Sequence, residues 1–375
     1  MQAKPRYHSI DALRGTVMII MALDHIRDFF NVSAMSFSPE DLSRTTPALF
    51  FTRWITHFCA PVFMFTAGMG AYFWWQQQNR TKGQLSAFLW TRGLWLILLD
   101  LTAMQVALNF SLDPRYPILL TVLWALGGAM IILAALIHLP VRALAIFSIA
   151  VIALHNRLDP INLPLLHNRG IFHVASFTLI FTYPLIPWFA VMSAGFCFAA
   201  IFHRQLTLKL GIALTVAFIA IRALNVYGDP IKWSVQPHAV LSFLRCAKYP
   251  PSLDFLLMTL GPALIYLAWL NRFQFSRNHP LIVFGRVPLF FFLVHFYAIR
   301  AVTFLLAWLR YGQVSFLFSP LPSAGGSPKS FPPNFGYDLW VVYVIWIAII
   351  AALYPLCRWF AGIKARRHEW WLSYL

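Results

Sequence analysis

The chain alternates between long apolar segments and shorter polar ones. A membrane-spanning helix needs roughly 20 apolar residues, and ten stretches of the sequence approach or exceed that length. These predicted spans are residues 9–31, 54–75, 86–108, 117–138, 141–155, 182–203, 209–227, 255–271, 281–309 and 337–360. Because the fifth span is short and the region 172–203 is long, the pattern allows nine to eleven crossings. We therefore predict an all-α, polytopic transmembrane helical bundle of about ten spans.

Composition supports a membrane protein without a separate soluble domain. Hydrophobic residues make up 60% of the chain and charged residues 11%, whereas soluble domains carry roughly 25% charged residues. We interpret residues 1–375 as a single integral membrane domain. The segment 310–336, rich in Pro, Gly and Ser, is predicted to be a flexible outer loop within it. The four cysteines show no metal-binding or disulfide spacing, so no metal site is expected.

The distribution of Lys and Arg predicts the orientation. Positive charge is denser in the short segments that share a side with the N-terminus, which favours cytoplasmic N- and C-termini. The formal net charge of +17 fits this topology and attraction to anionic membrane lipid. The charge is not gathered on one soluble module, so nucleic acid is not an expected partner.

The first span carries unusual polar groups. Arg14 and His25 are eleven residues apart, which places them on one helix face roughly 16 Å apart. Asp11 can pair with Arg14, and a denser group follows at residues 24–28. Ionisable groups within a span are costly and often mark a functional site. The alternative interpretation is an interfacial anchor at Arg14 and a helix-end cap at residues 24–28.

Further polar candidates lie in later spans. His57 precedes Pro61, which is expected to break the helix beside the imidazole. His295 lies within the ninth span, and Asp100 within the third, where we expect a structural hydrogen-bonding role. A cluster of polar residues between positions 222 and 229 lies at the end of the seventh span. The histidines could equally be satisfied structural residues.

Several motifs resemble a known family. They are Arg6 to Gly15 followed by Asp24-His25, Cys59-Ala60-Pro61-Val62-Phe63 with Gly68, Tyr183 to Trp188, Arg222-Ala223-Leu224-Asn225 with Tyr227 to Pro230, Lys248 to Ser252, and Gly285-Arg286-Val287-Pro288 with His295. Together they resemble the heparan-alpha-glucosaminide N-acetyltransferase catalytic-domain family of membrane proteins. The Arg-to-His spacing is also similar to that of the acyltransferase-3 membrane enzymes, which acylate sugars.

The resemblance implies a membrane acyltransferase in the bacterial inner membrane. It would move an acetyl or similar group from cytosolic acyl-CoA to an outward-facing sugar or glycan amine or hydroxyl. Catalysis requires a base, for which imidazole is suited, and donors near the developing oxyanion. The expected catalytic residues are His25, Asp24 and His57. The expected acceptor-side residues are Arg27, Asp28, Asn225, Asp229, Lys248 and His295. The expected acyl-CoA residues are Arg6, Asp11, Arg14 and Arg286.

The sequence departs from the family in one respect and leaves other functions open. The animal enzyme has its proposed active histidine in the outer loop after the first helix, and segment 32–52 contains none here. One alternative is a transporter or lipid-linked sugar flippase, with Asp24, His25 and Asp100 relaying protons. Another is a structural membrane protein, and homo-oligomerisation is possible in each case.

Overall fold

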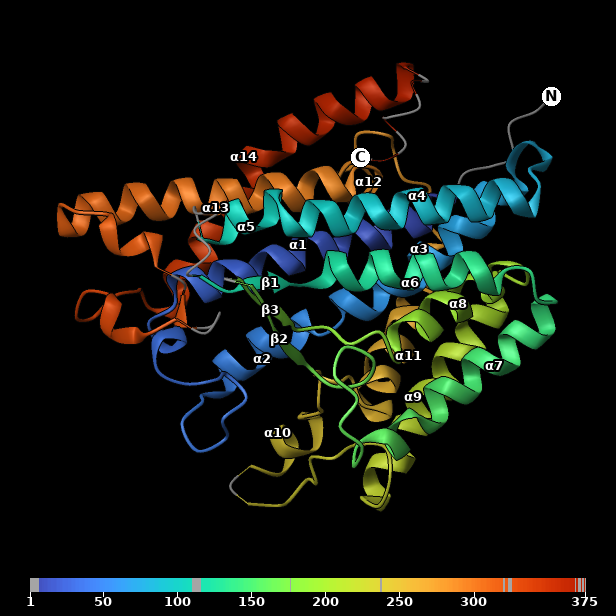
Figure 1. Ribbon diagram of the computed structural model, residues 1–375, viewed down its shortest axis with the longest axis horizontal. Coiled ribbons are helices and arrows are strands. Elements are labelled where there is room, and N and C mark those ends of the chain that lie inside the picture. Colours follow the sequence, from blue (N-terminus) through green and yellow to red (C-terminus); the bar gives the residue numbers. More distant parts are fainter. Residues whose placement is uncertain are drawn as a thin grey trace.

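The computed structural model shows a bundle of helices around one long, mostly buried helix, α1 (His8–Phe30) (Figure 1). The structure describes residues 7–109, 116–175, 177–236, 238–319, 321–322 and 326–367, together with residues 369, 372 and 374. Arg6, an expected acyl-CoA residue, lies outside the described residues. We call the end of the bundle at the C-terminus of α1 the outer end, following the predicted orientation, and the opposite end the inner end.

The elements follow the predicted apolar segments closely. The other α-helices are α2 (Pro47–Thr56), α3 (Cys59–Gln76), α4 (Lys82–Leu101), α5 (Ala103–Asn109), α6 (Val122–Leu136), α7 (Val141–Leu154), α8 (Trp188–Ala199), α9 (Arg204–Leu224), α10 (Ala239–Leu244), α11 (Leu253–Leu270), α12 (Pro280–Arg286), α13 (Pro288–Tyr311) and α14 (Leu339–Arg366). Short 3-10 helices are η1 (Val32–Met35), η2 (Gln77–Asn79), η3 (His155–Leu158), η4 (Ser315–Phe318) and η6 (Pro328–Ser330).

The helical membrane character is confirmed, while the number of crossings stays a prediction. Among the described residues, seven helices are long and apolar enough to span a bilayer. The others that coincide with predicted spans are α1, which carries several charged residues, and the shorter apolar helices α6 and α8. Each of the ten predicted spans therefore contains a helix.

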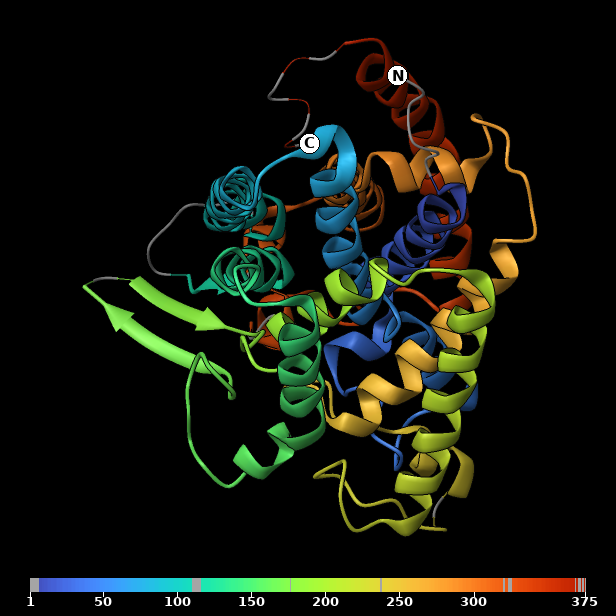
Figure 2. The same ribbon diagram turned by 90° about the vertical axis from the view of Figure 1, so that its right-hand side faces the viewer.

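Three short strands were not predicted. They are β1 (Ile118–Leu120), β2 (Gly170–Val174) and β3 (Phe177–Phe181), arranged in the order β1-β3-β2. β1 is parallel to β3 and β2 is antiparallel to it. The β2–β3 hairpin projects from one side of the bundle in Figure 2, which looks almost along α4 and α6. Short apolar runs do not distinguish a strand from part of a buried helix by composition, and β1 was included in the predicted span 117–138. β2 and β3 lie between the predicted spans 141–155 and 182–203, where no element was predicted.

α1 and α12 approach each other very closely at the inner end. A Cβ atom built on Gly15 would lie 1.9 Å from the carbonyl oxygen of Leu281, and one on Gly285 would lie 1.8 Å from that of Asp11. Only glycine permits this approach, as is common where membrane helices pack through small residues. The contact brings the side chains of Asp11 and Arg286 close together, with Arg286 Nε 3.8 Å from Asp11 Oδ2.

Two helix termini have clear local causes. Pro61 lies in the first turn of α3, and the helix is interrupted between Thr56, the end of α2, and Cys59, the start of α3. This confirms the helix break predicted from the proline. Asp100 accepts hydrogen bonds from Thr121 N at 2.6 Å, Thr121 Oγ1 at 2.8 Å and Trp124 N at 3.0 Å. It thereby caps the N-terminus of α6, and its predicted structural role is confirmed.

The connections at the two ends of α1 hold distant parts of the chain together. At the outer end, the backbones of Asn31 and Tyr337 form an isolated parallel β-bridge, and Arg310 donates to the Gly336 carbonyl oxygen at 2.7 Å. At the inner end, Ser9 Oγ donates to Asn271 Oδ1 at 2.5 Å. In the described part of segment 310–336, aromatic rings pack together, as the 5.4 Å between the ring centroids of Phe316 and Phe335 illustrates.

Candidate active site

His25 lies in the outer half of α1 and contacts a second histidine from α13. Its Nδ1 is 2.7 Å from Nε2 of His295, and its ring stacks on Phe296 with centroids 4.3 Å apart. His295 is fully buried, whereas His25 is partly exposed. The structure therefore brings together one predicted catalytic histidine and one residue expected on the acceptor side.

Asp24 is held by two arginines. Arg53 from α2 donates to Asp24 Oδ2 at 2.6 Å, and Arg27 NH1 forms an ion pair with Oδ1 at 2.8 Å. Arg27 also donates to Asp28 at 2.6 Å. These four side chains, two acidic and two basic, form ion pairs with one another. Such pairing offsets the free-energy cost of burying each charge. Arg53 was not among the expected site residues, although it lies only four residues before His57.

His57 pairs with a carboxylate from the segment after α1. Its Nε2 is 2.7 Å from Oε1 of Glu40. Burial by itself raises the pKa of Glu40, but the hydrogen bond from His57 and the nearby charges outweigh it and lower the pKa to about 2. Glu40 is therefore an ionised partner for the imidazole. Nothing in the sequence around Glu40 indicated this pairing, because its partner is brought close only by the fold.

Lys248 and Tyr249 complete the outer end of the site. Lys248 is buried, and its ammonium lies 5.3 Å from the centre of the Tyr249 ring. The Tyr249 hydroxyl donates to that of Tyr183 at 3.1 Å. Burial opposes ionisation of Tyr249, but the charges of Lys248 and Arg53 outweigh it and lower the pKa of Tyr249 below its usual value. Both tyrosines lie in motifs that resembled the family, and that signal could have identified them. We call Asp24, His25, Arg27, Asp28, Glu40, Arg53, His57, Lys248 and Tyr249 the outer cluster.

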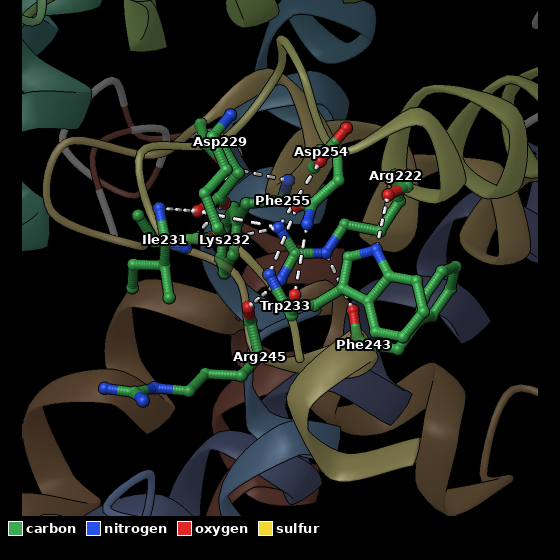
Figure 3. Close-up of polar contacts among 12 residues, drawn as sticks. Arg222, Asp229, Ile231, Lys232, Trp233, Phe243, Arg245, Asp254 and Phe255 are labelled. Atoms are coloured by element: carbon green, nitrogen blue, oxygen red, sulfur yellow. Dashed lines mark hydrogen bonds and ion pairs between the residues drawn. The ribbon is translucent and has the colours of Figure 1, made fainter. Parts of the chain in front are cut away.

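A single arginine holds the loop that carries Lys248 (Figure 3). The buried guanidinium of Arg222 donates to the carbonyl oxygens of Ile231 at 2.7 Å, Phe243 at 2.9 Å and Arg245 at 2.7 Å. It also donates to the Ser242 carbonyl at 3.1 Å. One side chain at the end of α9 therefore holds Ile231 and residues 242–245 together.

Asn225 and Asp229 lie in this same loop. Asn225 has a left-handed backbone, with φ 54°, and its side chain exchanges hydrogen bonds with the backbone of Trp233. Asp229 accepts from Ile231 N at 2.7 Å, from Ala247 N at 2.9 Å and from the Ser252 hydroxyl. Burial raises the pKa of Asp229, and those hydrogen bonds and Arg222 partly offset the rise. The structure places both residues in the loop framework beside Lys248, and not in contact with His25 among the described interactions.

The inner half of the bundle contains a cavity of about 370 Å³, within the usual range for small-molecule sites of roughly 300–1,000 Å³. Four basic side chains line it, namely Arg14, Arg92, Arg286 and Lys364. Arg14 donates to the Thr66 carbonyl oxygen, and Arg286 Nε lies 3.8 Å from Asp11 Oδ2. We call this the inner cavity. It contains two of the expected acyl-CoA residues, with Asp11 beside them, and adds Arg92 and Lys364, which sequence reasoning missed.

The inner cavity ends beside the outer cluster. Most of its remaining lining is apolar and includes Met18, Leu289 and Phe292. The ring of Phe292 packs edge-on against His25, with centroids 6.3 Å apart, and also contacts His295. The predicted Arg14–His25 face of α1 thus connects a basic cavity to a histidine. Within the described part of the chain, no group of three or more His, Cys, Asp or Glu residues is placed to hold a metal ion.

The family model of the catalytic region of heparan-alpha-glucosaminide N-acetyltransferase matches residues 6–231. The chain belongs to this family. The family comprises membrane N-acetyltransferases, which implies a donor of the acetyl-CoA type and a sugar acceptor. The matched region includes Arg14, His25 and His57, whereas Lys248, Arg286 and His295 follow it. No curated protein was found to match the chain.

Proposed function

We propose that the protein transfers an acetyl or similar acyl group from cytosolic acyl-CoA to an amine or hydroxyl of an outward-facing sugar, across the bacterial inner membrane. One observation carries the proposal: the inner cavity is lined both by four basic side chains and by Phe292, which contacts His25. A donor with a charged head and a long uncharged arm fits a cavity whose wall combines basic and apolar side chains.

The donor would bind through its phosphates and its arm. Arg14, Arg92, Arg286 and Lys364 supply positive charge at the cavity wall, and charge-assisted hydrogen bonds to phosphate are strong. Asp11 positions Arg286 from across the α1–α12 contact. Met18, Leu289 and Phe292 then line the path of the arm towards His25.

Transfer would occur directly, without a covalent enzyme intermediate. The acceptor's nitrogen or oxygen attacks the thioester carbon while His25 takes the proton that this atom loses. The carbon–sulfur bond breaks, and the CoA thiolate leaves and receives a proton. Lys248 and Arg27 would stabilise the oxyanion that forms between these steps.

The remaining outer residues would position the acceptor. Asp28 lies on the same helix as the base, and Arg53 links the His57–Glu40 pair to Asp24. Either group could hold a sugar hydroxyl. Asn225 and Asp229 would act through the loop that presents Lys248. His57, held by a carboxylate, is the second candidate for the base.

The direct test uses purified protein in nanodiscs with radiolabelled acetyl-CoA and a panel of hexosamines and neutral hexoses. We expect label on at least one sugar, and roughly 10²–10⁴-fold slower labelling with His25→Ala protein that still binds acyl-CoA. Wild-type protein that binds no acyl-CoA and labels no member of the panel would overturn the proposal.

The orientation is tested separately with introduced cysteines. Ser327→Cys should react with an impermeant thiol reagent added to intact cells, and Lys82→Cys should react only after lysis. The reverse pattern would place the inner cavity on the wrong side for a cytosolic donor.

A further inference from the structure

The His25–His295 pair joins two helices that are far apart in the sequence. Besides its 2.7 Å contact with His25, His295 places Nδ1 3.0 Å from the carbonyl oxygen of Phe291. Its other neighbours are the rings of Phe291, Phe292 and Phe296. These surroundings are apolar, and a charged imidazole is costly there.

The directions of these hydrogen bonds determine where the protons lie. A carbonyl oxygen can only accept, so Nδ1 of His295 carries the proton in the bond to Phe291. A neutral imidazole has one N–H, so Nε2 of His295 is an acceptor. The partner atom, Nδ1 of His25, must then be the donor. Nε2 of His25 is left with a lone pair.

Asp24 is engaged elsewhere. Its two carboxylate oxygens pair with Arg27 at 2.8 Å and Arg53 at 2.6 Å. Among the described contacts, the hydrogen bond of the His25 ring is the one to His295. The group that orients His25 is therefore a second histidine on α13, and not the adjacent carboxylate that its sequence position suggests.

We infer that His295 is a positioning residue that holds His25 with its proton on Nδ1, so that Nε2 is the atom that accepts the acceptor's proton. The role in catalysis rests on the proposed function, whereas the proton arrangement does not. The two hydrogen bonds form a chain from His25 through His295 to the Phe291 carbonyl oxygen. Because this oxygen can only accept, it fixes the direction of both hydrogen bonds. An imidazole held in one tautomer by a second group is a general feature of efficient histidine bases.

The proton arrangement can be measured without any activity. Protein labelled with ¹⁵N-histidine in proteoliposomes would be examined by solid-state NMR, with His25→Gln and His295→Gln used to assign the two signals. We expect a protonated Nδ1 and an unprotonated Nε2 in both rings. A proton on Nε2 of His25, or on both nitrogens of either ring, would overturn the inference. An inactive wild-type protein with the expected spectrum would instead count against the proposed function alone.

The kinetic arm compares two substitutions at one site. A glutamine at 295 can still accept from His25 Nδ1, whereas leucine cannot. His295→Leu should lose kcat on the order of 10²-fold with KM for acyl-CoA unchanged, and His295→Gln should retain substantially more activity. Thr303→Val, a buried polar change on the same helix, controls for insertion and yield. Wild-type kcat in His295→Leu, or equal losses in both variants, contradicts a positioning role.

Discussion

Two groups of buried charges lie towards the outer end of the bundle, and they are built in different ways. Arg222 donates to four backbone carbonyl oxygens and lies 3.7 Å from Asp254 and 3.9 Å from Asp229. The outer cluster instead consists of side chains that pair with one another. Among the described residues, Nδ1 of His57 and Nε of Arg27 in the outer cluster are buried without a hydrogen-bond partner, and so is Oδ1 of Asp254 beside Arg222.

The difference separates a structural role from a chemical one. Hydrogen bonds from one side chain to several backbone carbonyls fix a loop and leave little capacity for a ligand. Buried polar atoms without partners are costly and call for an explanation. For the nitrogens of the outer cluster a bound substrate is one, whereas Oδ1 of Asp254 belongs to a carboxylate whose other oxygen lies 3.7 Å from Arg222. On this comparison, the Arg222 group has the structural role and the outer cluster has the chemical one. The following predictions test that division, beginning with the largest expected effect.

Arg222→Met should prevent the loop from folding onto α9 and α11. The substitution removes one partner from each of four carbonyl oxygens and takes the nearby cation from two carboxylates, and breaking a buried pair typically costs about 3–5 kcal/mol. We expect little monodisperse protein and a strongly lowered melting temperature. Lys232→Met, an exposed cation in the same loop, should stay within about 0.5 kcal/mol of wild type. An Arg222→Met protein that melts like wild type would contradict the structural role.

His25→Ala should keep the fold and acyl-CoA binding but lose acyl transfer by roughly 10²–10⁴-fold, the usual cost of removing a general base. His57→Ala should be milder. Single-turnover rates together with an acyl-CoA binding measurement would separate chemistry from binding. The opposite order of effects would assign the base to His57, and activity in both variants would leave these histidines with packing roles.

Glu40→Gln should change the pH dependence of stability. The pKa of Glu40 falls from an ordinary 4.5 to about 2 in the folded protein, so its carboxylate stabilises the fold above pH 4.5. That contribution, at most about 3 kcal/mol, is lost as the pH falls from 4.5 towards 2. Wild type should therefore be more stable than Glu40→Gln at neutral pH, with the difference shrinking across this window in thermal melts. A difference independent of pH would mean that Glu40 acts without its charge.

Arg14→Ala should weaken acyl-CoA binding by roughly tenfold, since a hydrogen bond to a charged group contributes about 1.5–3 kcal/mol and three other basic side chains line the cavity. Calorimetry on protein that purifies normally would show this change. Arg204→Ala, an exposed basic residue at the start of α9, should bind acyl-CoA as wild type does. Unchanged binding in Arg14→Ala would make Arg14 an anchor of the inner end of α1.

Much of the fold could be predicted because it is encoded locally. Apolar length and composition placed a helix in each of the ten expected spans, and Pro61 marked a break that the structure contains. The strands β2 and β3 lie between the predicted spans 141–155 and 182–203 and were not predicted, because β3 pairs with β1, which is far away in the chain. For the site, the helical period placed Arg14 and His25 on one face correctly, since that relation lies within one helix.

The sequence by itself determined the membrane class, the order of the helices, the family and the polar face of α1, because each depends on residues close together in the chain. The tertiary structure decided which partners those polar groups have. His25 meets His295 across 270 positions, His57 meets Glu40, and Arg222 meets carbonyl oxygens that no side-chain pattern reveals. Such pairings depend on how whole helices pack, and a backbone carbonyl offers the same acceptor whatever residue carries it.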